Sequence, residues 1–99
     1  MKRRSKIYFQ DIEEPVPVRV KRKIISAGHL VGTTPDQLGE ERKLVNDLLF
    51  GANEFDALCI KLQKLVLKEN PDAELTCTQV SACETVGDCI TLVETTIKA

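Results

Sequence analysis

Apolar residues recur at intervals of three or four positions in three long stretches of the chain. The first stretch has its apolar positions at Val16, Val20, Ile24, Ala27 and Val31. Lysine and arginine fill the positions between them, so the pattern predicts an amphipathic helix with one buried stripe and a basic outer face. Gly28 weakens its last turn, and Gly32 is placed to end it.

Two later stretches predict further helices. One begins at Asn53, a good N-cap, and ends before the pair Asn70-Pro71. Its apolar positions are Phe55, Leu58, Leu62, Leu65 and Val66. The last helix begins with Thr85 as its cap and Asp88 three residues later. It places four apolar residues on one face, Val86, Ile90, Val93 and Ile97.

The segments between these helices contain shorter elements. Thr34-Pro35-Asp36-Gln37 has the signature of a helix start, but only a short turn fits before Gly39. Apolar residues at 44–50 should pin a long connection onto the core. Residues 76–83 are rich in threonine and predict at most a short helix. No convincing pair of alternating strands is present. We therefore expect an all-α, small four-helix bundle with a short third helix and a long loop between helices 1 and 2.

Length and charge refine this picture. The 99 residues suit one domain, which we assign to 16–99, preceded by a basic N-terminal tail at 1–15. Residues 1–25 carry eight basic and three acidic side chains, and the rest carries six basic and twelve acidic ones. Such a split fits either a basic arm that meets an acidic partner or a solvated tail. Only Tyr8 and Phe9 accompany the basic cluster, so nucleic acid is not the expected partner.

The apolar runs and the cysteines bear on where the protein resides. No apolar run approaches the roughly 20 residues of a membrane span, and no apolar signal core follows the basic start. We therefore expect a cytoplasmic protein. The four cysteines are Cys59, Cys77, Cys83 and Cys89. They form no C-x-x-C pair, and the single histidine, His29, is distant in sequence. We expect no metal site and reduced thiols packed as small apolar side chains.

Five short motifs carry a resemblance to a known family. They are VKRKII at 20–25, PDQL at 35–38, LVNDL at 44–48, GANEFD at 51–56 and TVGD at 85–88. In this order, from about residue 18 to 98, they resemble the acyl carrier proteins, whose motifs read roughly as a Lys/Ile helix, P-E-E-I, F-V-E-D-L, G-A-D-S-L-D and T-V-G-D-L. The match needs an insertion near 49–50 and another near 68–71. The resemblance implies a four-helix bundle of acyl-carrier-protein type.

One motif departs from the family at its functional position. The serine of the D-S-L motif carries phosphopantetheine in acyl carrier proteins, and Glu54 stands at that position here, flanked by Asn53, Phe55 and Asp56. A carboxylate cannot form the stable phosphodiester, and the serines of the chain lie outside the motif. We therefore expect no cofactor. Glu54 also lacks a second carboxylate or a nucleophile nearby in sequence, so no catalytic residue is expected.

Three hypotheses follow from this departure. The first is a carrier-like domain without the prosthetic arm that acts as a non-enzymatic protein-interaction or regulatory module. The second is a specialised acyl carrier protein of fatty-acid, lipid or polyketide synthesis, which would carry phosphopantetheine. The third is a bundle that binds a lipid without covalent attachment. The first ranks highest because Glu54 stands in place of the serine, so the site contradicts the carrier activity that fold resemblance alone would suggest.

The expected partner is another protein, an enzyme or assembly related to acyl transfer, and the chain is expected to be a monomer. The family's second helix is typically acidic, whereas here it carries a stripe of Lys61, Lys64 and Lys68. The predicted contact surface consists of Leu49, Phe50, Glu54, Phe55, Lys61 and Lys64. The basic N-terminal tail is a second candidate surface.

Overall fold

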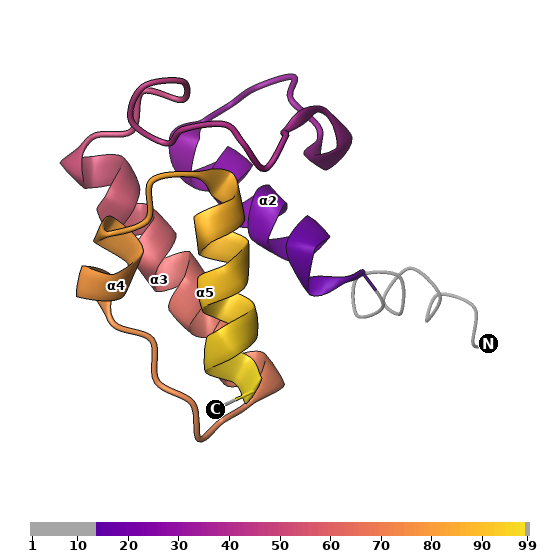
Figure 1. The fold of residues 1–99 in the computed structure, drawn as a ribbon, viewed down its shortest axis with the longest axis vertical. Coiled ribbons are helices and arrows are strands. Elements are labelled where there is room, and N and C mark those ends of the chain that lie inside the picture. The colour runs from indigo at the N-terminus through magenta and orange to yellow at the C-terminus, as the bar shows by residue number, and fades with distance from the viewer. Residues whose placement is uncertain (1–13, 99) are drawn as a thin grey trace.

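The structure is a computed structural model that describes residues 14–98. Its elements are α2 (Val16–Gly28), the short 3-10 helix η1 (Pro35–Gln37), α3 (Ala52–Glu69), α4 (Cys77–Ser81) and α5 (Val86–Lys98) (Figure 1). The described part of the chain contains no strand, only an isolated antiparallel bridge between Lys43 and Thr85. The prediction of an all-α protein with a short helix between two longer ones is confirmed.

Helices α2, α3 and α5 pack against one another, and α4 lies against α3 and α5. The long connection between α2 and α3 runs across one end of these helices, as the purple and magenta trace of Figure 1 shows. None of the helices within residues 14–98 combines the length and the apolar character needed to cross a membrane. Residues 1–13, which make up most of the predicted basic tail, lie outside the described residues.

The buried stripes of the three long helices form the core. Each helix contributes the apolar residues that its period predicts, among them Val20, Ile24, Leu58, Leu62, Val66, Val86 and Val93, all fully buried. Val31 was wrongly placed on the first stripe, because its side chain is 95% exposed. The reason is that α2 ends at Gly28 and His29 takes a left-handed conformation (φ 54°, ψ 44°), so the helix does not continue to Gly32 as expected.

The long connection is held to the core at its apolar positions. Leu44 and Phe50 are buried, as the sequence predicts, while Leu49 has a φ of 61° and is 80% exposed. Backbone hydrogen bonds tie the connection to the start of α5. The N–H of Leu44 donates to the carbonyl of Glu84 at 2.9 Å, and the N–H of Val86 donates to the carbonyl of Arg42 at 3.0 Å.

The helix ends show which capping predictions hold. At α5 the N–H of Asp88 donates to Thr85 Oγ1 at 3.1 Å, and the N–H of Thr85 donates to Asp88 Oδ2 at 3.1 Å, so this cap is as predicted. Helix α3 ends at Glu69 with Asn70 after it, also as predicted. Its start was predicted wrongly: the N-cap is Gly51, and Asn53 lies within the first turn.

The cysteines differ from the prediction of four reduced thiols. Cys59 of α3 and Cys77 at the start of α4 form a disulfide, with their Cα atoms 5.3 Å apart. The bond joins two cysteines that are 18 residues apart in sequence and links the short helix α4 to α3, the longest one. Cys83 and Cys89 are free and buried. Since disulfides persist in oxidising environments, the thiol-based argument for a cytoplasmic location no longer holds.

Candidate interaction site

The side chain of Glu54, the residue that the resemblance aligned with an attachment serine, makes a local hydrogen bond. The residue lies in the first turn of α3 and is half-buried. Its Oε1 accepts a hydrogen bond from the backbone N–H of Gly51 at 2.8 Å. That N–H belongs to the helix start, where backbone donors lack partners within the helix. The carboxylate therefore stabilises the beginning of α3.

The predicted contact surface divides into buried and exposed residues. Phe50 is only 4% exposed, so its assignment to the surface was wrong. Its ring meets the ring of Phe55 edge-on, with the centroids 5.5 Å apart, and it fills the space beside Gly28 at the end of α2. The sequence predicts two roles for Phe50, as an apolar anchor of the connection and as a contact residue, and its burial is consistent only with the first. Leu49 next to it is exposed, as a contact residue should be.

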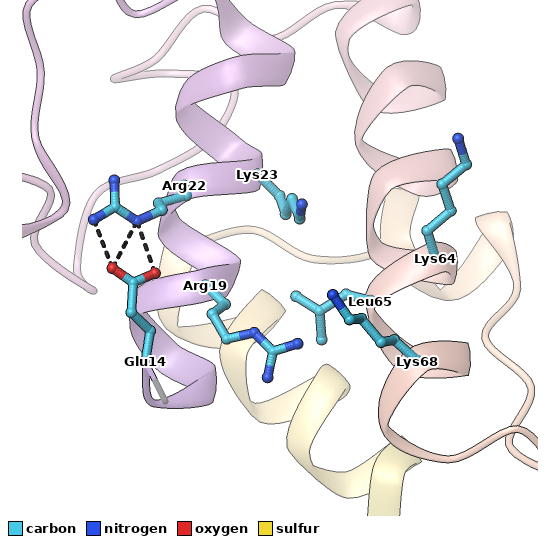
Figure 2. A pocket seen from close by; sticks show the side chains of 7 residues that line it. All are labelled: Glu14, Arg19, Arg22, Lys23, Lys64, Leu65 and Lys68. Carbon is cyan, nitrogen blue, oxygen red and sulfur yellow. Dashed lines mark hydrogen bonds and ion pairs between the residues drawn. The ribbon is translucent and has the colours of Figure 1, made fainter. Parts of the chain in front are cut away.

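Basic residues of α2 and α3 line an open groove of about 420 Å³ between the two helices (Figure 2). Arg19 and Lys23 project from α2 toward α3, and Lys68 reaches from α3 back toward α2. Leu65 lies between them as an apolar lining residue. Lys64 and the paired side chains of Glu14 and Arg22 complete the lining. The sequence pattern identified the lysine stripe of the second helix but missed that the basic face of the first helix lies opposite it.

The two arginines of this groove are neutralised by carboxylates. Arg19 Nη1 lies 2.6 Å from Glu69 Oε2, and Arg22 Nη2 lies 2.7 Å from Glu14 Oε2. The hydrogen bond from Arg22 is the main cause that lowers the pKa of Glu14. The two groove arginines thus already bind carboxylates of the chain itself.

The lysines of the groove have no such partners. Between residues 14 and 98, no ion pair or hydrogen bond is made by the ammonium groups of Lys23, Lys64 and Lys68, which line the groove, or by that of Lys61, which is not part of the lining. The pKa of Lys23 is lowered, first by burial and then by the positive charges of Lys61, Arg19, Lys68 and Lys64. Because like charges repel across the groove, an anion placed there would be attracted by several cations at once.

Two exposed aliphatic side chains lie next to the lysine stripe. Ile60 and Leu67 are 53% and 50% exposed. They stand four residues before and three residues after Lys64, so helical spacing places all three on one face of α3. Of the predicted contact residues, Lys61 and Lys64 therefore belong to a mixed basic and apolar face. Leu49, Glu54 and Phe55 lie near the start of the same helix.

Two features of residues 14–98 bear on metal and thiol chemistry. No group of three or more His, Cys, Asp or Glu side chains within 14–98 is placed to hold a metal ion. The two free thiols contact each other in the interior. The hydrogen bond to Cys83 and burial raise the pKa of Cys89, whereas the same hydrogen bond lowers the pKa of Cys83. Burial of both sulfurs limits their access to substrates.

Comparison of the chain with family models, with curated proteins and with solved structures gives no match. The structural features that bear on function are the helical bundle, the capping role of Glu54 and the basic and apolar face of α3.

Proposed function

We propose that the chain is a non-enzymatic interaction or regulatory module, built on a bundle of acyl-carrier-protein type, that binds another protein through the exposed face of α3. The observation that carries the proposal is the arrangement of Ile60, Lys64 and Leu67 on that face, with both aliphatic side chains about half exposed. Aliphatic side chains beside unpaired basic groups provide the two parts of a protein interface, an apolar core and a charged rim.

The carrier-type part of the proposal is supported by the order of elements. A first helix, a long connection, a long second helix, a short helix and a final helix follow one another along the chain. The absence of the prosthetic arm is supported by Glu54, whose carboxylate accepts the Gly51 N–H. A module with this site recognises its partner by surface contact, without acyl transfer.

Site-specific photo-crosslinking tests the proposal in cells that produce the protein. A photoreactive amino acid replaces Leu67, and in a matched variant it replaces Thr95, an exposed residue of α5. We expect one dominant protein adduct from position 67, none of the same mass from position 95, and loss of the adduct when Lys64→Glu is added. Equal adducts from both positions, or no protein adduct from position 67, would contradict the proposal.

A further inference from the structure

We infer that the groove between α2 and α3 binds an acidic helix of the partner protein, with carboxylates that repeat at the spacing of Lys61, Lys64 and Lys68. The inference rests on the proposed function and specifies the chemistry of the partner. It concerns the groove of Figure 2 and the lysine stripe that borders it.

The groove carries an excess of positive charge. Arg19 and Arg22 are paired with glutamates, but the three lysines of the lining have no anionic partner among residues 14–98. Lys61, which belongs to the lysine stripe but not to the lining, has none either. Burial and the neighbouring cations disfavour the charge of Lys23. A ligand with several negative charges relieves this repulsion, whereas a neutral ligand does not.

The positive charges of the lysine stripe are spread along α3. Lys61 and Lys68 are seven residues apart in α3, which places them roughly 10 Å apart along the helix axis. A single small anion cannot contact both. A second helix has the same rise, so glutamates at positions i, i+3 and i+7 of a partner helix match the three lysines of α3. The spread of the lysines favours an acidic helix over one isolated anionic group.

The groove and the lysine stripe combine cations with apolar side chains. Two cations of this groove already bind carboxylates. Arg19 Nη1 lies 2.6 Å from Glu69 Oε2, and Arg22 Nη2 lies 2.7 Å from Glu14 Oε2. Leu65 lines the groove, and the exposed Ile60 and Leu67 border the lysine stripe. An amphipathic helix with apolar residues beside its glutamates covers both kinds of surface. The chain's own residues 1–13 are a poor match in charge, because they hold four basic and two acidic side chains.

A pair of labelled helical peptides tests the inference by fluorescence anisotropy with the full chain. The first peptide carries glutamates at i, i+3 and i+7 beside leucines, and the second has the same composition with the glutamates distributed around the helix. We expect the first peptide to bind at least about tenfold more tightly than the second, with affinity that falls as salt increases.

Lysine variants of the protein test whether the first peptide binds at the lysine stripe. We expect the double change Lys64→Gln and Lys68→Gln to weaken binding of the first peptide by about tenfold or more. Lys43→Gln is the control, because it removes one positive charge from an exposed residue of the connection between α2 and α3. Its affinity for the first peptide should stay within about twofold of the wild-type value. Circular dichroism and thermal unfolding of each variant verify that the fold is retained.

Several outcomes would overturn the inference. Equal affinity for the two peptides would mean that only net charge matters. Displacement of the first peptide by a single-stranded RNA that binds more tightly would indicate a polyphosphate ligand. Concentration-dependent dimerisation that the Lys64→Gln, Lys68→Gln double variant abolishes would make a second copy the occupant. If neither peptide binds but the crosslink from position 67 persists, the acidic-helix inference fails while the proposed function stands.

Discussion

The carboxylate of Glu54 accepts a hydrogen bond from the backbone N–H of Gly51, with Oε1 and N 2.8 Å apart. Glu54 thereby satisfies a donor at the start of α3 that has no partner within the helix. The negative charge also lies near the positive end of the helix dipole. Two independent contributions thus make Glu54 a stabilising residue of this helix.

Replacing Glu54 by alanine should lower the free energy of unfolding by about 0.5–2 kcal/mol, because the variant loses both the hydrogen bond and the charge near the helix start. Glu54→Gln retains a hydrogen-bond acceptor and should recover part of the loss. Urea denaturation followed by circular dichroism measures both variants. An alanine variant as stable as the wild type would show that the carboxylate does not contribute to α3.

Incubation with coenzyme A and a broad-specificity phosphopantetheinyl transferase should leave the intact mass of the wild-type protein unchanged, because on the proposed carrier-type bundle a carboxylate stands where the serine would be modified. The variant Glu54→Ser restores the hydroxyl of the family motif and, on a bundle of carrier type, should gain the mass of one phosphopantetheine arm. A mass gain by the wild type would mean that another serine is used, and it would favour a working carrier protein.

Reduction of the Cys59–Cys77 disulfide should destabilise the protein. The bond closes a loop of 18 residues in sequence, for which restriction of the unfolded chain corresponds to about 3 kcal/mol. Urea denaturation with and without dithiothreitol measures the difference. The Cys77→Ser variant is the control, since its stability should not respond to the reductant. A wild type that is equally insensitive to dithiothreitol would contradict the prediction.

The helices could be predicted from sequence, because a buried stripe on a regular period is a local signal. Val20, Leu62 and Val93 all fall where that period puts them. The disulfide could not be predicted, since the bundle brings Cys59 and Cys77 together from separate elements. The lysine stripe of the candidate site was visible in α3, but the groove exists only because Arg19 and Lys23 of α2 face it. Local patterns do not determine which helix faces are neighbours.

Two leucines of α3 differ in burial and should therefore differ in their contribution to stability. Leu62 is fully buried, so Leu62→Ala should lower the free energy of unfolding by about 2–5 kcal/mol through lost burial and the cavity it leaves. Leu67, five residues later, is 50% exposed, so Leu67→Ala should change stability by less than about 1 kcal/mol. Chemical denaturation of both variants measures the difference. Equal losses would show that the orientation of the helix differs from the structure.

The Asp88 carboxylate should make stability depend on acid pH. Its Oδ2 accepts hydrogen bonds from the N–H groups of Glu84 at 3.0 Å and Thr85 at 3.1 Å, and these bonds lower the pKa of Asp88 below its ordinary value of 3.8. Because the folded-state pKa is lower than the unfolded one, the contribution is fully present above the unfolded pKa. It is lost as the pH falls through the folded pKa.

The variant Asp88→Asn should therefore be less stable than the wild type near neutral pH, and the difference should shrink as the pH falls below the ordinary aspartate pKa of 3.8. Urea denaturation over a pH series measures the difference between the two proteins. Asp72→Asn removes an exposed carboxylate that accepts no hydrogen bond from residues 14–98, so it controls for the change in net charge. A difference that stays constant across the series would mean that the Asp88 carboxylate does not cap α5 through its charged form.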